Sequence, residues 1–325
     1  MNAKTLKAIG AALLLTSISS GAIAQSDYPN RAITLIVSFA PGGLSDVPAR
    51  LLAAEMQGKI GQNIIVENKP GASGTIGGAF FARSAPDGYT LLASATAETQ
   101  NLHYLSVPYK ATEFSHIGKI ANGPSLVLIT NASSPHKTVK DLISYAKANP
   151  GKVSFSTSGP ATSPAIAVAQ LNKLADTDIV SVAYRGTGPA ATAVLTGEVQ
   201  AAWVFYTSAK PLVDDGKARV LAVASAKRLP ELPDTPTMDE VGYPGFDHTA
   251  FIGLSAPANT PPAIIEKLNR ALNETVNTPE FRKKLEPLGM RPPPAPNSPQ
   301  EYTEFMSAEI ARQGELAAIV KASAR

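Results

Sequence analysis

Short runs of β-branched and apolar residues alternate with helix-forming segments along almost the whole sequence, and this alternation constrains the fold more than any other feature. A strand–helix repeat of this kind is typical of an α/β protein with mainly parallel sheets. At 325 residues, the chain has the length of about two ordinary domains. Strands are predicted at Ile33–Phe39, Asn63–Glu67, Tyr89–Ser94, Leu126–Thr130, Val153–Ser156, Ile179–Ala183, Val199–Phe205 and Arg219–Ala224.

Residues that favour helix starts mark several of the intervening helices. A helix is predicted over Asp46–Met56, directly after the first strand. Another begins where Thr138 and Asp141 have the spacing of a capping box. Thr260 and Ser298 each precede a proline, and a cap residue followed by a first-turn proline predicts two helices in the last fifth of the chain.

The first 24 residues have the three parts of a secretory signal peptide. Lys4 and Lys7 precede the apolar run Ile9–Ile18, and small residues follow up to Ala24 in an A-x-A cleavage pattern. The alternative is a membrane anchor, which needs about 20 apolar residues, and this run has half that length. We therefore expect cleavage after Ala24, export, and a periplasmic location for the mature chain.

Composition excludes several classes of function. Once the two lysines of the signal peptide are subtracted from the 29 basic residues, 27 remain against 26 acidic residues, whereas binding to nucleic acid needs clustered Lys and Arg. The absence of cysteine excludes disulfides, thiolate catalysis and zinc–thiolate sites. The sequence also lacks a G-x-S-x-G elbow, a Walker loop and an H-E-x-x-H motif, and its four histidines lie far apart. We therefore expect no catalytic residue, metal or cofactor.

The segment Ser38–Asp46, SFAPGGLSD, lies between the first predicted strand and the first predicted helix. Its glycines permit a tight turn, and the unpaired amides at the start of the helix attract anions. Such a loop can bind a carboxylate without Lys or Arg. The alternative is that Ser45 or Asp46 merely caps the helix.

Three further loops follow predicted strands. Gly71–Gly78 is rich in small residues, which permit close approach to the backbone by a ligand or, as the simpler role, by another helix. Ser156–Ser163 is rich in hydroxyls that either donate to a carboxylate or cap a helix. Gly186–Ala191 matches the pattern G-x-G-x-x-A, but the acidic residue expected about 20 positions later is missing, so we reject a dinucleotide site. The adjacent Arg185 can bind a carboxylate through two hydrogen bonds.

Several short motifs stand in a specific order along the mature chain. They are Pro41-Gly42-Gly43 with Asp46 and Arg50, Val66–Gly77, Ala85–Leu92, Tyr184-Arg185-Gly186, Leu221–Val223 with Ala226–Arg228, Leu232–Thr237, Ala256-Pro257 and Leu288-Gly289. Each motif alone is weak. In this order and spacing, the chain resembles the substrate-binding proteins of tripartite tricarboxylate transporters, the Bug family, over nearly its whole mature length.

The resemblance implies an α/β, two-domain periplasmic-binding-protein fold of type II, a Venus flytrap with a ligand cleft between its domains. After the signal peptide, domain 1 is expected over residues 25–124 and 246–325, and domain 2 over residues 125–245. A small carboxylate, aromatic or dicarboxylate, is the expected ligand, and the membrane subunits of a tripartite tricarboxylate-type transporter are the expected partner. A monomer is expected, because the protein must dock on a permease.

Together with the loops above, the resemblance predicts one ligand site shared by the two domains. Its residues are Phe39, Pro41, Gly42, Gly43, Ser45, Asp46, Ser94 and Thr96 from domain 1, and Thr157, Ser158, Gly159, Thr162, Tyr184, Arg185, Gly186, Phe205 and Tyr206 from domain 2.

Departures from the family pattern bear on the ligand. Ala165, Ala193, Tyr206 and Phe251 stand where the family often has His, Asp, Asp and Trp. If these positions face the cleft, the pocket is less acidic and favours an aromatic or partly apolar acid over an amino acid. Two other functions are alternatives: presentation of the ligand to a membrane sensor, and hydrolysis or isomerisation in the periplasm.

Overall fold

The computed structural model describes residues 28–323, apart from residues 40, 43, 160–161 and 185–186. The first part of the chain forms β1 Ile33–Val37, α2 Asp46–Ile60, β2 Ile64–Asn68, α3 Thr75–Ala82, β3 Thr90–Ala95, α4 Thr96–Tyr104 and β4 Ser115–Asn131. The middle part forms α5 Val139–Ala148, β5 Ser154–Thr157, α6 Ser163–Ala175, β6 Val180–Ala183, α7 Thr187–Leu195, β7 Ala201–Phe205, α8 Tyr206–Asp214 and β8 Ala218–Ala224. The last part forms β9 Thr249–Ala256, α9 Pro262–Val276, α10 Pro279–Leu285 and α11 Pro299–Ser323. Short 3₁₀ turns lie at η1 Ala72–Gly74, η2 Ala111–Glu113 and η3 Glu286–Leu288.

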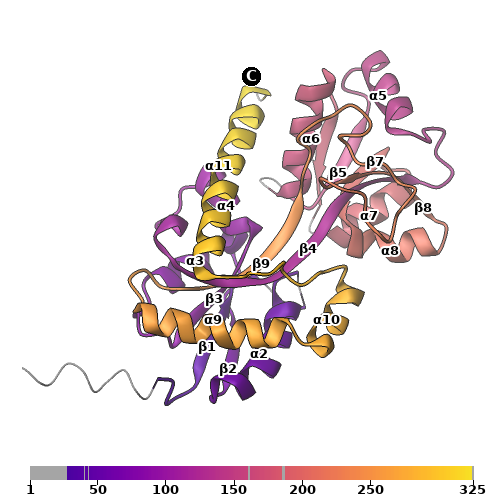
Figure 1. The fold of residues 1–325 in the computed structure, drawn as a ribbon. Coiled ribbons are helices and arrows are strands. Elements are labelled where there is room, and N and C mark those ends of the chain that lie inside the picture. Colours follow the sequence, from indigo (N-terminus) through magenta and orange to yellow (C-terminus); the bar gives the residue numbers. More distant parts are fainter. Residues whose placement is uncertain (1–27, 40, 43, 160–161, 185–186, 324–325) are drawn as a thin grey trace, which may run out of the picture.

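The strands form one curled sheet that passes through two lobes (Figure 1). In the first lobe the order is β2-β1-β3-β9-β4, and the second half of β4 continues into the second lobe, where it pairs with β7 and β8. The pairings of β1 with β2 and β3, and of β5 with β6 and β7, are parallel. Every described pairing of β4 or β9 is antiparallel, including that of the edge strand β8 with β4. The prediction of mainly parallel sheets therefore holds for β1–β3 and for β5–β7 and fails where strands pair with β4 or β9.

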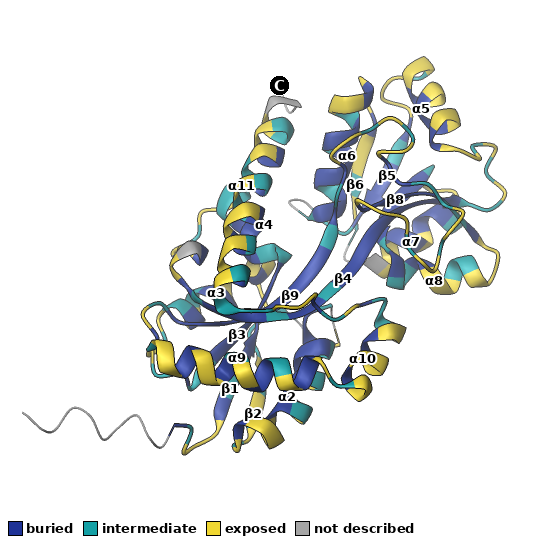
Figure 2. Cartoon of the chain, viewed as in Figure 1, coloured by how far each residue is buried: buried dark blue, intermediate teal, exposed yellow. Residues whose placement is uncertain are grey.

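Each lobe has its own hydrophobic core (Figure 2). In the first lobe, α2, α9 and α10 cover the sheet through residues such as Leu52, Leu268 and Phe281. In the second lobe, Trp203 is fully buried and stacks on Phe246 with ring centroids 5.2 Å apart. Within the described part of the chain, none of the helices combines the length and apolar character that a membrane crossing requires.

Two strands that join the lobes were not predicted at their full length. β4 was predicted only over Leu126–Thr130, and β9 was not predicted at all. The register between β4 and β9 shifts at three places, so their side chains do not alternate regularly between the faces of the sheet. Glycines such as Gly118 and Gly253 interrupt both segments, and glycine lowers strand propensity.

Helix caps agree well with the sequence, with one exception. The Thr138 hydroxyl accepts a hydrogen bond from the Asp141 amide at 3.1 Å, and the Asp141 carboxylate accepts one from the Thr138 amide at 2.9 Å. Ser298 and Glu301 form the same reciprocal pair at the start of α11. Thr260 was expected to cap α9, but its hydroxyl donates to the Pro257 carbonyl instead, and the helix begins at Pro262.

Candidate functional site

A cavity of about 600 Å³ lies between the two lobes. Loops that follow the carboxyl ends of β1, β3, β5 and β7 form much of its wall. This edge of an α/β sheet is where ligands usually bind, because the loops there are not needed to hold the sheet together. The cavity is lined by Phe39, Pro41, Gly42, Leu44, Ser45, Ser73, Ala95, Thr96, Ala97, Gln100, Asn101, Ser158, Thr162, Ser163, Pro164 and Phe205.

The starts of three helices face this cavity. Ser45 precedes α2, Thr96 begins α4, and Ser163 begins α6, so the unpaired amides of helix starts from both lobes lie around one space. Among the described lining residues, no side chain is charged. The Ser45 hydroxyl is buried and has no hydrogen-bond partner in the described structure. The site therefore offers partial positive charge and free donors, which suit an anion with an apolar body.

Asp46 was predicted to bind ligand, but it lies outside the described cavity lining and shapes the loop beside it. One carboxylate oxygen accepts hydrogen bonds from the Gly42 amide at 2.8 Å and from Arg50 Nε at 2.9 Å, and the other accepts one from Asn68 Nδ2 at 2.8 Å. Burial raises the pKa of Asp46, but these hydrogen bonds outweigh burial, so its pKa lies below the ordinary value. Asp46 thus stays ionised and holds the β1–α2 loop in place.

In the second lobe, the predicted residues Ser158 and Thr162 line the cavity, but their neighbours Thr157 and Gly159, which were also predicted, do not. The Thr157 hydroxyl lies 3.4 Å from both Ser181 Oγ and the Val182 carbonyl oxygen, inside the lobe. Gly159 has φ +129°, a conformation that favours glycine, and its carbonyl accepts a hydrogen bond from the Thr162 hydroxyl at 2.7 Å. These contacts shape the loop before α6.

Of the remaining predicted site residues, one lines the cavity and the other described ones lie elsewhere in the two lobes. Phe205 lines the cavity, but Tyr206 is buried in the core of the second lobe, and Tyr184 packs against that core. Ser94 is buried and lies 2.9 Å from Tyr302 Oη and 3.3 Å from Ser255 Oγ, so it joins β3 to β9 and α11 instead of facing the cavity. Three more predicted residues lie outside the described residues: Gly43, Arg185 and Gly186.

Two glycines of the small-residue segment Gly71–Gly78 lie inside α3 and serve close contact, as the simpler interpretation of that segment predicted. A Cβ atom on Gly77 would lie 2.8 Å from Ser38 Cα, and one on Gly78 would lie 2.7 Å from the Tyr109 hydroxyl. Glycine is needed at both positions because α3 lies directly against the β1–α2 loop and the Tyr109 ring. Ser73 also lines the cavity.

The four departures from the family pattern do not line the described cavity, so they give no support to an aromatic ligand. Ala165, Ala193, Tyr206 and Phe251 are absent from the described cavity lining, and Ala193 and Phe251 are buried in hydrophobic clusters. The cavity is nevertheless largely apolar through other side chains, among them Phe39 and Phe205.

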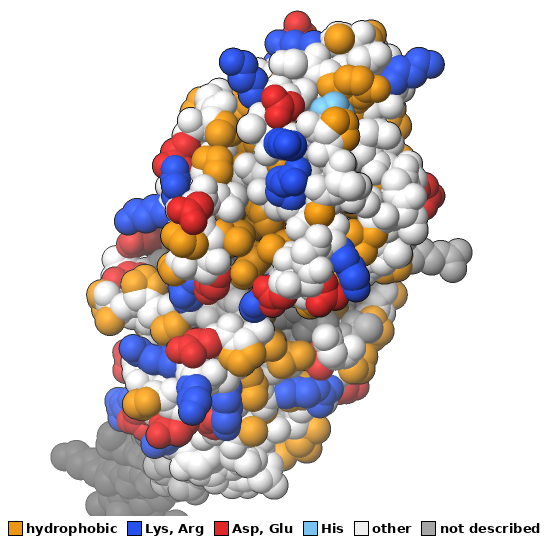
Figure 3. Space-filling model, turned by 90° about the vertical axis from the view of Figure 1, so that its right-hand side faces the viewer, with side chains coloured by type: hydrophobic (Ala, Val, Ile, Leu, Met, Phe, Trp, Pro, Cys, Tyr) orange, Lys and Arg blue, Asp and Glu red, His pale blue; other side chains and the backbone are white. Residues whose placement is uncertain are grey.

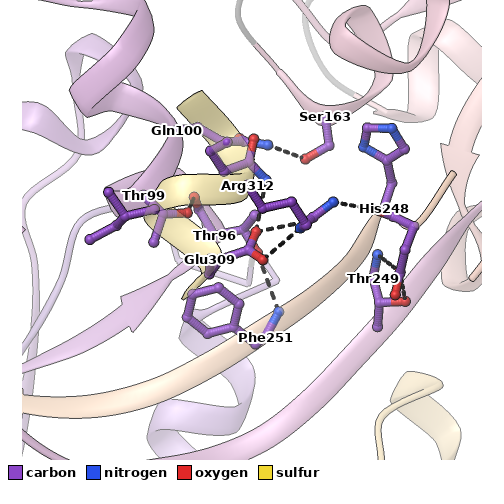
Figure 4. Close-up of polar contacts among 12 residues, drawn as sticks. Thr96, Thr99, Gln100, Ser163, His248, Thr249, Phe251, Glu309 and Arg312 are labelled. Atoms are coloured by element: carbon purple, nitrogen blue, oxygen red, sulfur yellow. Dashed lines mark hydrogen bonds and ion pairs between the residues drawn. The ribbon is translucent and has the colours of Figure 1, made fainter. Parts of the chain in front are cut away.

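Two lining residues that connect the lobes, Gln100 and Ser163, are missing from the predicted site, although Ser163 ends the hydroxyl-rich segment Ser156–Ser163. Gln100 of α4 donates a hydrogen bond from Nε2 to Ser163 Oγ of α6 at 2.9 Å, and both side chains are buried (Figure 4). Leu44, Ser73, Ala95, Ala97, Asn101 and Pro164 also line the cavity without having been predicted. Ala95 and Ala97 could have been found from their place after the third strand, but no local pattern shows that Gln100 meets Ser163.

Further polar contacts lie near the crossing strands, and one of them joins the two lobes. Arg312 of α11 pairs with Glu309 and donates a hydrogen bond to the Asp247 carbonyl at 2.6 Å, just before β9 (Figure 4). Arg291 pairs with Glu231 of the second lobe at 2.7 Å. On the face shown in Figure 3, side chains of both charges are interspersed, an arrangement typical of a solvated surface.

Comparisons with known proteins identify the family and the fold of the chain. The family model of the tripartite tricarboxylate transporter family receptor matches residues 48–322. MatC from Rhodopseudomonas palustris, solved with bound malate, is 31% identical, with a TM-score of 0.77 and coverage of 89% of this chain and 100% of MatC. An R. palustris protein solved with adipate is 30% identical, with a TM-score of 0.79 and coverage of 91% and 99%. The periplasmic binding protein BugD is 30% identical, with a TM-score of 0.75 and coverage of 90% and 99%.

These likenesses extend over both lobes and confirm the predicted α/β, two-domain periplasmic-binding-protein fold. The match to the family model covers far more than half of the sequence, and it confirms the resemblance that the motifs carried. The chain therefore belongs to the tripartite tricarboxylate transporter receptor family, with the Bug proteins among its relatives.

Proposed function

We propose that this chain is a periplasmic solute-binding protein that captures a small carboxylate, a dicarboxylate above all, in the interlobe cavity. The observation that carries this proposal is the meeting of helix starts from both lobes around a cavity whose described side chains are uncharged. Two ends of one dicarboxylate can bind helix starts in different lobes, while an aliphatic chain contacts residues such as Phe39 and Phe205. The malate and adipate found on the two solved relatives support this ligand class.

The experiment is binding of a ligand panel to refolded, ligand-free mature protein, measured by thermal shift and then by calorimetry. The panel contains malate, adipate, citrate, benzoate and glutamate, with adipamide as the matched control, since it has the length of adipate without its charge. We expect a stabilising shift with at least one carboxylate and none with adipamide. Equal binding of adipate and adipamide, or no shift with any acid, would refute the proposal.

Delivery to the membrane subunits of a tripartite tricarboxylate-type transporter is part of the same proposal, as is release of the ligand chemically unchanged. The family to which the chain belongs supports both. We further propose cleavage after Ala24, domain 1 over residues 25–124 and 246–325, and domain 2 over residues 125–245. N-terminal sequencing of the exported protein should start at Gln25, and the ligand recovered after long incubation should be unmodified.

The bond between Gln100 and Ser163 leads to a prediction about affinity. It joins the lobes beside the cavity, so it stabilises the arrangement in which both lobes contact the ligand. Ser163→Ala should weaken ligand binding about 3- to 10-fold, the value of one hydrogen bond of about 1 kcal/mol. Calorimetry checks this, with Ser307→Ala on the exposed side of α11 as the control.

Gln100→Ala should have a similar effect, and the double variant should be no weaker than either single variant. Fully additive losses would show that the two side chains act independently and would contradict the role of the bond.

A further inference from the structure

Glu98 is a buried carboxyl group next to the cavity that the proposed ligand contacts do not use. It lies in the first turn of α4, and the residue is 1% exposed. One oxygen, Oε2, accepts a hydrogen bond from the Ala95 amide at 2.6 Å. Ala95, Thr96 and Ala97 are consecutive residues of the cavity wall, so this carboxyl group binds the same helix start that faces the cavity.

The groups that favour an ionised Glu98 are all neutral: the Ala95 amide, its own amide and the Ser38 hydroxyl each lower its pKa. The Ser38 hydroxyl lies close enough to lower the pKa of Glu98, yet neither Ser38 Oγ nor Glu98 Oε1 has a hydrogen-bond partner in the described structure. Tyr109 and Tyr302 are the titratable groups that interact with it, and both are neutral at ordinary pH because burial raises their pKa values. Burial is the largest influence on Glu98 itself and raises its pKa to about 7.

The elements packed against α4 bring no cation to this carboxyl group. Helix α3 and strands β3 and β9 contain no Asp, Glu, Lys, Arg or His, and neither does η1. Glu113 of η2 is exposed and paired with Lys110. On α4 itself, His103 is bonded to the Ile310 carbonyl of α11. Farther along α11, Glu309 and Arg312 pair with each other.

A carboxylate at a helix start offsets the partial positive charge there. When Glu98 is ionised, it occupies the Ala95 amide and adds a negative charge within one turn of the cavity wall. A ligand carboxylate at the start of α4 then meets a weaker attraction and a repulsion. When Glu98 is neutral, the Ala95 amide is still bonded, but the negative charge is gone and the repulsion of the ligand carboxylate disappears with it.

We propose that Glu98 is a positioning residue that makes carboxylate binding proton-coupled, because the cavity binds its ligand best when Glu98 is neutral. This inference rests on the proposed function. By linkage, the ligand in turn favours the protonated form of Glu98, and a proton is taken up on binding at pH values where free Glu98 is ionised. Affinity for a carboxylate should therefore fall as the pH rises through the range in which Glu98 ionises.

The test is calorimetry with adipate as the probe, from pH 6.0 to pH 8.5. For the wild type we expect adipate to bind about tenfold more weakly at pH 8.5 than at pH 6.0. We also expect proton uptake on binding, which appears as a dependence of the binding heat on the buffer. Glu98→Gln keeps the acceptor for Ala95 and should bind adipate equally at all these pH values. Glu113→Gln, an exposed control in the same lobe, should keep the wild-type dependence.

Lys119 makes the variant comparison necessary, because burial lowers its pKa to about 8 and it titrates in the same range. A wild type that binds adipate equally from pH 6.0 to pH 8.5, without proton uptake, would overturn the inference. So would Glu98→Gln with the wild-type dependence. If Glu98→Gln fails to fold, proton uptake by the wild type still shows whether binding is coupled to a proton. The Lys119→Met variant then identifies the contribution of the lysine.

A measurement without ligand separates this inference from the proposed function. Burial raises the pKa of Glu98 above the ordinary value of 4.5, so its contribution to stability is complete at low pH and is lost as the pH rises through about 7. The melting temperature of Glu98→Gln relative to wild type should therefore rise between pH 5 and pH 8. His116 and His248, whose pKa values burial lowers to about 4 and 3, contribute equally to both proteins. A flat difference would overturn the inference even if no adipate binds.

Discussion

Gly253→Ala is expected to destabilise the protein by about 3 kcal/mol, at the upper end of the usual cost of overpacking a core. Gly253 lies in β9, and a Cβ atom there would lie 1.8 Å from the Tyr302 hydroxyl and 2.1 Å from the ring carbon that bears it. Tyr302 cannot simply move aside, because it is fully buried and its hydroxyl lies 2.9 Å from Ser94 Oγ. The strand or the start of α11 has to shift.

Gly58→Ala is the matched control for this prediction. Gly58 lies in the last turn of α2, is exposed, and has no atom within 4 Å of the position that a Cβ would take. Alanine there should stabilise the chain by about 0.5–1 kcal/mol, because it lowers the backbone entropy of the unfolded state and favours the helix. Urea unfolding of both variants measures the difference.

A cost below about 1 kcal/mol for Gly253→Ala would show that α11 is not held against β9 as described. The double variant Gly253→Ala/Tyr302→Leu provides a further check. Without the Tyr302 ring, Gly253→Ala should destabilise the protein less, so the effects of the two changes should be far from additive. Full additivity would place the cause of the instability elsewhere than in the contact between these residues.

Ala97→Asp is expected to weaken binding of a carboxylate ligand by about 100-fold or more. Ala97 lines the cavity in the first turn of α4. A carboxylate there lies near the ligand, and two like charges about 4 Å apart repel by about 4 kcal/mol in partly shielded surroundings. The fold should tolerate the change, because acidic residues are favourable in the first turn of a helix.

Ala97→Asn separates charge from size, since it introduces a side chain of the same shape without the negative charge. Calorimetry with the best carboxylate of the panel should show a loss of only a few-fold for Ala97→Asn. Equal losses of affinity for the two variants would indicate a steric effect and would not support a negatively charged ligand in this cavity. No loss for Ala97→Asp would show that the ligand binds outside this cavity.

Much of the site was predictable because it follows from local rules. Each predicted strand was followed by a loop at its carboxyl end, and in an α/β fold these ends share an edge of the sheet. For that reason Pro41, Thr96, Ser158 and Phe205, predicted from separate segments, line one cavity. The role of Asp46 was ambiguous from the sequence, because a residue at a helix start can contact either a ligand or its own loop.

The sequence by itself determined the features that depend on residues close together along the chain. These are the alternation of strands and helices, the caps at Thr138 and Ser298, and the motifs of the family. Only the tertiary structure decided which distant residues meet, because such contacts depend on how the lobes are placed. Gln100 reaches Ser163 across 63 positions, and Ser94 reaches Tyr302 across 208. The burial of Glu98 has the same origin, since the environment of a carboxyl group is set by every element that packs around it.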